Sequence, residues 1–251
     1  MNNLPELIQK YLRYCEGQRR LDSKTLKAYR IDLEQYCACF VDANISDITI
    51  PDIENYVTEM HDIYKPKTVK RKIASIKALY HYLEFQDLIS VNPFNKIRIH
   101  FRTPQTLPKT IPLHTIQTLL STMYREHRGA ATPFRHKKTL RDIATVEVLF
   151  STGIRISELC SLKKSDVDLY DGSILIFGKG AKERLIQIGS RDVLQLLIQY
   201  KQTFHREMEQ TGRFFVNPDA SPLSDQSVRR MLKKYCALSC LLYTSDAADE
   251  L

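Results

Sequence analysis

The chain has 251 residues, and its 37 Lys and Arg residues against 29 Asp and Glu residues give a formal net charge of +8. A hydrophobic content of 43% excludes wholesale disorder, and no apolar run approaches the roughly 20 residues that span a bilayer. The chain starts without a secretory signal pattern and has six scattered cysteines, so we expect a reduced, cytoplasmic protein that binds a polyanion and no membrane.

The first part of the chain predicts amphipathic helices. Apolar residues recur at helical spacing over residues 4–15. Ser23 is expected to cap a second helix, Pro51 suits the first turn of a third, and Thr68 is expected to cap a fourth. Because short helices of this kind pack into a compact bundle, we expect a four-helix first domain over 1–95.

The region 96–112 is expected to be a linker, because prolines punctuate a polar and basic stretch without sustained periodicity. Residues 113–239 are expected to form a mixed second domain. Helices are predicted around residues 116–123, 140–152, 156–162 and 193–200 and from Ser224, and strands over 173–177 and 184–188. Gly153 is placed to end the helix before it in a left-handed cap. The predicted fold is therefore mainly α, with a small antiparallel β-sheet in the second domain.

Basic residues gather in three clusters along the chain, over residues 13–30, 65–77 and 135–141. Three separated basic clusters are what a surface that follows a phosphate backbone needs. The alternative is that each cluster is an ordinary solvated helix face. Composition alone leaves both interpretations open.

The first segment that indicates chemistry places an arginine between two predicted helices. It reads Thr152-Gly153-Ile154-Arg155-Ile156-Ser157-Glu158-Leu159. Main chain on both sides would hold Arg155, whose rigid fork of donors suits phosphate oxygens. Glu158 lies three residues further on the same helical face and is expected to hold Arg155 in place. The alternative is a surface ion pair without function.

The second segment is a basic turn between the two predicted strands. It reads Gly178-Lys179-Gly180-Ala181-Lys182-Glu183-Arg184. The glycines that flank Lys179 leave room for another backbone to approach. A nucleotide-binding P-loop is excluded, because Gly180 stands where Ser or Thr would bind magnesium and a strand, not a helix, follows. The alternative is a hairpin turn with solvated lysines.

Together, the two segments resemble the motifs of the tyrosine recombinase family, the phage integrases and Xer-like enzymes, and the resemblance covers nearly the whole chain. It implies an N-terminal SAM-like core-binding domain that clamps duplex DNA, followed by part of an α+β catalytic domain. In the family, a tyrosine attacks the scissile phosphate and forms a 3′-phosphotyrosine link without metal or cofactor. Arg155 would then neutralise the phosphate, Lys179 would protonate the leaving 5′ hydroxyl, and Glu158 would support the site.

The resemblance also implies double-stranded DNA as the partner and a homo-tetramer on paired sites. The fourth predicted helix is the best candidate for lying against the major groove, and the second is expected to meet phosphates. The residues expected to contact DNA are Lys24, Lys27, Arg30, Lys70, Arg71, Lys72, Lys77, Lys182 and Arg184.

The later motifs of the family, His-x-x-Arg, a His or Trp and the nucleophilic Tyr, are not recognised in this sequence. Tyr243 is not assigned as the nucleophile, because no His-x-x-Arg precedes it. Residues 240–251 turn acidic and resemble read-through of a sequencing adapter, so we expect a non-native tail. The sequence therefore predicts a C-terminally truncated, inactive recombinase fragment. The alternatives are a non-catalytic DNA-binding protein on the same architecture and a helical interaction protein.

Overall fold

The computed structural model describes residues 3–40, 43–45, 47–97, 110–178 and 183–241. The chain folds into two compact units, Met1–Leu107 and Pro108–Leu251. Most of the linker expected over 96–112 lies outside the described residues, so the domain limits expected from the sequence stay predictions.

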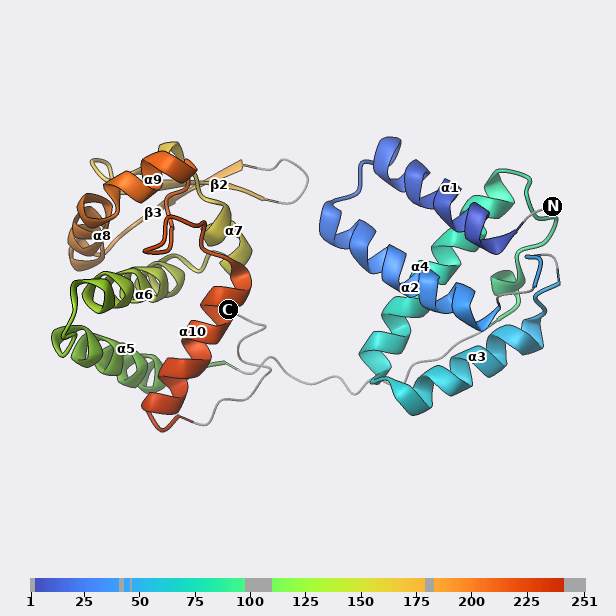
Figure 1. Cartoon of the computed structure of the whole chain (residues 1–251), viewed down its shortest axis with the longest axis horizontal. Coiled ribbons are helices and arrows are strands. Elements are labelled where there is room, and N and C mark those ends of the chain that lie inside the picture. Colours follow the sequence, from blue (N-terminus) through green and yellow to red (C-terminus); the bar gives the residue numbers. More distant parts are fainter. Residues whose placement is uncertain (1–2, 41–42, 46, 98–109, 179–182, 242–251) are drawn as a thin grey trace. The chain divides into compact units, whose positions relative to one another are not determined.

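The N-terminal unit is built around a bundle of helices, as the spacing of its apolar residues predicts. Its elements are α1 (Leu4–Gly17), α2 (Ser23–Cys39), α3 (Ile50–Ile63), α4 (Pro66–Phe85) and the short 3₁₀ helix η1 (Pro93–Asn95) (Figure 1). The apolar stripe of each α-helix faces one common core. Burial of these stripes, rather than helix propensity, supplies most of the stability of such a bundle.

Two helices of this unit begin differently from the prediction. Asp22, not Ser23, caps α2, because its carboxylate accepts the Thr25 backbone N–H at 3.0 Å. Ser23 is therefore the first helical residue. α4 begins at Pro66, whose fixed φ suits a first helical turn, so Thr68 lies inside the helix instead of capping it.

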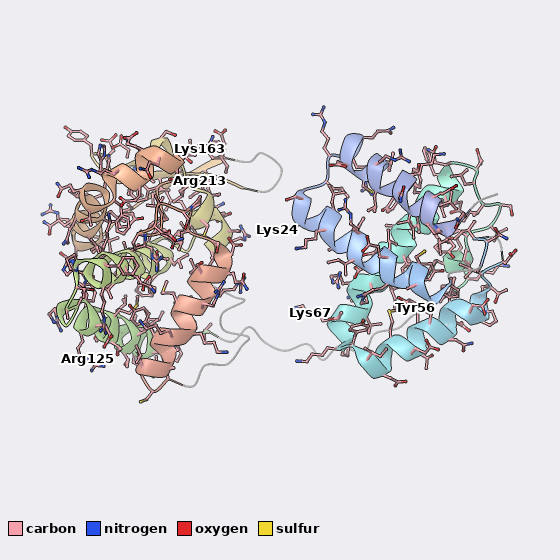
Figure 2. All side chains as sticks on the ribbon, in the orientation of Figure 1. Lys24, Tyr56, Lys67, Arg125, Lys163 and Arg213 are labelled. Atoms are coloured by element: carbon pink, nitrogen blue, oxygen red, sulfur yellow. The ribbon has the colours of Figure 1, made fainter. Side chains whose placement is uncertain are left out.

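Tyrosines fill the centre of the N-terminal core. Tyr11, Tyr36 and Tyr80 are fully buried, and the hydroxyls of Tyr36 on α2 and Tyr80 on α4 lie 2.8 Å apart. The ring of Tyr56 on α3, which is labelled in Figure 2, packs edge-on against Tyr36, with 5.3 Å between the centroids. These contacts join α2, α3 and α4. Because the hydroxyls of Tyr36 and Tyr80 are hydrogen-bonded to each other inside apolar surroundings, neither is left without a partner.

The C-terminal unit combines helices with a small antiparallel sheet (Figure 1). Its elements are α5 (Leu113–Arg128), α6 (Pro133–Thr152), α7 (Ile156–Ser161), the 3₁₀ helix η2 (Lys164–Asp166), β1 (Val167–Asp168), β2 (Ser173–Phe177), β3 (Glu183–Gln187), α8 (Arg191–Thr203), α9 (His205–Thr211) and α10 (Asp225–Leu238). The strand order is β1-β2-β3, and Ile176 on β2 pairs with Arg184 on β3. The predicted fold class, mainly α with a small antiparallel sheet, is confirmed.

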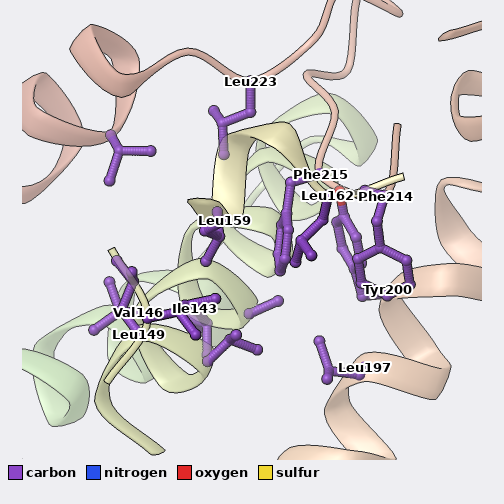
Figure 3. Packing of buried hydrophobic residues seen from close by; sticks show 14 of the residues in the cluster. Ile143, Val146, Leu149, Leu159, Leu162, Leu197, Tyr200, Phe214, Phe215 and Leu223 are labelled. Carbon is purple, nitrogen blue, oxygen red and sulfur yellow. Dashed lines mark hydrogen bonds between the residues drawn. The ribbon is translucent and has the colours of Figure 1, made fainter. Parts of the chain in front are cut away.

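One continuous core holds the C-terminal unit together (Figure 3). Ile143 on α6, Leu159 on α7 and Leu197 on α8 are fully buried within it. Tyr200 lies in the same core, where its hydroxyl accepts the Val216 backbone N–H at 2.9 Å. Leu159 therefore anchors the short helix α7, which could not be stable alone.

The C-terminal unit departs from the predicted elements at three points. α6 begins at Pro133, well before the expected start at residue 140, and Thr132 caps it by accepting the Arg135 backbone N–H at 3.2 Å. β3 begins at Glu183 rather than at residue 184. β1 and α9 have no predicted counterpart, because both are too short to show a period. No helix in the described part of the chain is long and apolar enough to cross a bilayer.

Candidate active site

Arg155 lies where α6 has ended and α7 begins. Gly153 follows α6 in the left-handed conformation, with φ at 64°, and donates its N–H to the Leu149 carbonyl at 3.0 Å. Glycine adopts this conformation without the strain that a Cβ brings, and the cap predicted at this position is confirmed. Arg155 is then the N-cap residue of α7, in an extended backbone conformation.

Glu158 joins the first turn of α7 back to Arg155. The Arg155 backbone N–H donates to Glu158 Oε2 at 2.9 Å, and Arg155 Nη1 donates to Glu158 Oε1 at 3.1 Å. The side chain of Arg155 is 77% exposed, whereas that of Glu158 is 8% exposed. A buried carboxylate thus orients a guanidinium that stays open to solvent. The pairing expected from the three-residue spacing is present.

Arg184 reaches the same carboxylate from β3. Its Nη1 donates to Glu158 Oε1 at 3.1 Å and its Nη2 donates to Glu158 Oε2 at 2.7 Å. These hydrogen bonds, together with those from Arg155, hold the pKa of Glu158 at about 2, below its ordinary 4.5, although burial opposes the shift. Glu158 in turn raises the pKa of Arg184. Glu158 is therefore a carboxylate at any physiological pH.

The arrangement suits an anion. Arg155 and Arg184 share the single carboxylate of Glu158, so the three side chains keep one net positive charge. Because Arg155 is exposed and fixed in orientation, it can bind and neutralise a phosphate oxygen. Lys179 and Lys182 lie outside the described residues, and the roles expected for them stay predictions.

The basic cluster at 135–141 is largely engaged inside the C-terminal unit. Arg141 is buried and its Nε donates to Asp142 at 2.9 Å. Arg135 donates to Glu126, also at 2.9 Å. This stretch therefore offers fewer cations to a partner than its sequence indicates.

Most of the N-terminal residues expected to contact DNA lie at the surface. Those that are exposed on α2 and α4 are Lys24, Lys27, Arg30 and Lys70. Figure 2 labels Lys24 on α2 and also Lys67, which is exposed near the start of α4. Arg71 is half-exposed and bonded to Asp32. Lys77 is partly buried, with its ammonium 5.8 Å from the centre of the Phe94 ring.

Lys72 has to be removed from the predicted DNA contacts. It is only 2% exposed, its ammonium lies 3.5 Å from Oδ1 of the buried Asp32, and it donates to Gln35. A buried charge is tolerated only when it is paired and hydrogen-bonded. Lys72 meets both conditions, so its side chain belongs to the interior of the N-terminal unit. The sequence does not single out Asp32 as the partner of Lys72, although it contains a signal for it. Asp32 lies between Tyr29 and Tyr36 on the inward face of α2, where a charged residue needs a buried partner.

Known families match both units. Residues 8–86 match the N-terminal SAM-like domain of phage integrases, and residues 110–243 match the phage integrase family. A SAM-like unit followed by a unit that matches the phage integrase family defines a protein of the integrase type. The chain belongs to the phage integrase family, the tyrosine recombinases. The tyrosine recombinase of Agathobacter rectalis is 55% identical over 244 residues, which cover 96% of this chain and 79% of that protein.

Solved structures show the same fold at low sequence identity. The site-specific recombinase XerH bound to difH substrate in a pre-cleavage complex has a TM-score of 0.75 and 17% identity, over 99% of this chain and 83% of that chain. A lambda integrase tetramer bound to a Holliday junction has a TM-score of 0.69 and 19% identity, over 96% of this chain and 67% of that chain. The family expected from the two sequence motifs is confirmed.

Proposed function

We propose that this chain belongs to an enzyme that cuts and rejoins DNA at specific sites through a 3′-phosphotyrosine intermediate. The observation that carries the proposal is the exposed guanidinium of Arg155, anchored by the buried carboxylate of Glu158. A cation that is already oriented stabilises charge developing on a phosphate without having to reorganise during the reaction. The 55% identity to a tyrosine recombinase supports this reading over most of both chains.

The proposed chemistry is transesterification. A tyrosine hydroxyl gives up its proton to water and attacks the scissile phosphorus, a new phosphorus–oxygen bond forms to the tyrosine, and the bond to the 5′ oxygen breaks. Arg155 neutralises a non-bridging oxygen, and Lys179 gives its proton to the departing 5′ oxygen. Attack by a 5′ hydroxyl on the phosphotyrosine then reverses the step and joins strands.

We propose that the basic surface of the N-terminal unit holds the duplex, with phosphate contacts from Lys24, Lys27, Arg30 and Lys70. These side chains lie at the surface of α2 and α4, where long cationic side chains reach phosphates. The proposed assembly is a homo-tetramer on two duplexes, for which the lambda integrase tetramer on a Holliday junction is the structural parallel.

The nucleophile is proposed to lie outside this sequence. We expect a longer gene product to supply His-x-x-Arg and the attacking tyrosine after Ser239. Without these residues, the chain is expected to be unable to cleave DNA. Sequencing the coding locus past Ser239 tests this. A stop codon at that point, with neither motif downstream, contradicts it.

Covalent trapping tests the proposed reaction. The complete gene product is incubated with a nicked duplex that carries its recombination site, located first by footprinting, so that the short cleaved strand diffuses away. A protein–DNA adduct that survives denaturation is the expected result. Binding without any adduct would instead identify a non-catalytic DNA-binding protein.

The matched variants are Arg155→Ala and Arg125→Ala. Both arginines are exposed in the C-terminal unit, but Arg125 lies in the last turn of α5. Loss of one preorganised donor to a developing anion costs about a hundredfold to a thousandfold in rate, so Arg155→Ala should abolish trapping while most DNA binding remains. Near-normal trapping by Arg155→Ala would show that the site is assigned wrongly.

A further inference from the structure

The N-terminal unit contains a second buried carboxylate, Asp32 on α2, which accepts hydrogen bonds from three residues of α4. Ser75 Oγ donates to Oδ2 at 2.8 Å, Arg71 Nη1 donates to the same oxygen, and Lys72 Nζ lies 3.5 Å from Oδ1. Asp32 is fully buried. Every oxygen of this carboxylate is thus partnered, as a buried charge requires.

The charges of this cluster do not cancel. Asp32 carries one negative charge, whereas Arg71 and Lys72 carry two positive charges. The side chain of Lys72 is buried, and its ammonium also donates to Gln35 and lies 4.7 Å from the centre of the Tyr64 ring. Lys72 is therefore the cation that balances Asp32 inside the fold.

Arg71 is the cation in excess. Its side chain is 47% exposed although Asp32 is completely covered, so the guanidinium extends from the buried carboxylate to the surface of α4. An Arg has several N–H donors in a rigid plane. Because Nη1 is engaged by Asp32, the orientation of the remaining donors is fixed by a partner that does not move with solvent.

We propose that Asp32 is a positioning residue, which fixes Arg71 on the surface of α4 so that its guanidinium binds a DNA phosphate. Lys67 is exposed one helical turn before Arg71 on the same face of α4. Lys70 is exposed beside that face, one residue before Arg71 and about 100° around the helix from it. A row of cations of this kind follows a phosphate backbone. The inference rests on the proposed function only in requiring that the N-terminal unit binds DNA, and it is independent of cleavage.

A preordered guanidinium costs less entropy to bind than a flexible one, because fewer rotamers are lost. Arg71 should therefore contribute more to DNA affinity than its charge alone, whereas an exposed lysine such as Lys70 should contribute only its charge. This difference separates positioning from general electrostatics.

The test is DNA binding by the full chain, measured by fluorescence anisotropy on a labelled duplex over a salt series. The central variant is Asp32→Asn with Lys72→Met, which removes both buried charges and so leaves no unpaired ion in the core. We expect its affinity to fall about tenfold, as for loss of one charge-assisted hydrogen bond. Arg71→Ala should show a larger loss, because it also removes the charge of the guanidinium, and should lower the salt slope by about one.

Combining the variants shows whether the effect of Asp32 on DNA binding acts through Arg71. Asp32→Asn/Lys72→Met should add nothing to Arg71→Ala, but its effect should add to that of Lys70→Ala. Full additivity with Arg71→Ala, or unchanged affinity of Asp32→Asn/Lys72→Met, would overturn the positioning role. Absence of salt-dependent DNA binding by the unmodified chain would instead remove the proposed DNA contact of the N-terminal unit, and the inference with it.

Arg71→Lys provides a second test that does not depend on the altered core. It keeps the positive charge but has no planar fork that can hold Asp32 and a phosphate together. We expect Arg71→Lys to bind DNA more weakly than the unmodified chain, although more tightly than Arg71→Ala, because its positive charge remains. Affinity close to that of the unmodified chain would mean that charge alone matters and would refute the proposal, even if Asp32→Asn/Lys72→Met failed to fold.

Discussion

Arg184 and Glu158 form a bidentate ion pair that joins β3 to α7, in which Arg184 Nη1 donates to Glu158 Oε1 at 3.1 Å and Nη2 donates to Oε2 at 2.7 Å. The same carboxylate holds Arg155. Arg184 therefore determines how firmly Glu158 can hold Arg155, although Arg184 belongs to the other sequence motif. The two motifs that indicate the family meet on one buried side chain.

Replacing Arg184 with Ala should change the pH dependence of stability. The depressed pKa of Glu158, about 2 against an ordinary 4.5, means that the carboxylate stabilises the fold above pH 4.5 and loses this contribution as the pH falls toward 2. Without Arg184, the pKa of Glu158 rises toward its ordinary value. We expect the variant to be less stable at neutral pH, by a margin that shrinks between pH 4.5 and 2.

Urea unfolding of both proteins over this pH range provides the measurement, and the carboxyl resonance of Glu158 gives its pKa directly. Arg125→Ala is the control, because Arg125 is exposed on α5. A stability difference between Arg184→Ala and the unmodified chain that stays constant from neutral pH to pH 2 would show that the ion pair is not the cause.

Any side chain at Gly153 should lower the free energy of unfolding. Its φ of 64° is left-handed, and no heavy atom outside its immediate neighbours lies within 4 Å of an added Cβ, so backbone strain alone decides. Gly153→Ala should lower the free energy of unfolding by about 1–2 kcal/mol. Gly153→Asn should cost less, since asparagine adopts this conformation more readily. Equal stability of Gly153→Ala and the unmodified chain, in denaturant titrations, would contradict this.

Local sequence signals predicted the elements well, and long-range pairing lay beyond them. The apolar period of α4 and the glycine after α6 are properties of adjacent residues, and both are present in the structure. The contact of Arg184 with Glu158 spans 26 positions and depends on the register of β2 and β3. Such a contact has no local signature.

Lys72 shows that a count of basic residues does not tell which of them are exposed. The basic cluster over residues 65–77 favours one exposed surface, but helical geometry turns Lys72 inward while its neighbour Arg71 stays at the surface. The helical position of each charge, not the number of charges, decides which of them can reach DNA. α6 likewise begins at Pro133, so the basic residues 135–141 lie inside the helix, whereas the sequence predicts a helix start at residue 140.

Leu159 links the candidate active site to the core. It is fully buried and follows Glu158 on α7. Leu159→Ala should lower the free energy of unfolding by about 2–5 kcal/mol, because truncation removes buried methyl groups and leaves a cavity. Leu185→Ala is the control, since Leu185 on β3 is 63% exposed and should change stability by at most about 0.5 kcal/mol. Similar losses for both leucines would contradict the observed burial.

The buried hydroxyl pair of Tyr36 and Tyr80 should show strong coupling. Their oxygens lie 2.8 Å apart in the core, and burial raises the pKa of Tyr80 to about 12, so both stay protonated at any ordinary pH. Tyr36→Phe alone leaves the Tyr80 hydroxyl without its partner and should cost about 1–3 kcal/mol. The same reasoning applies to Tyr80→Phe.

Removing both hydroxyls leaves an apolar contact of similar shape, so the double variant should lose less stability than the sum of the single variants. Additive losses in a double-mutant cycle of urea unfolding would mean that the two hydroxyls do not depend on each other.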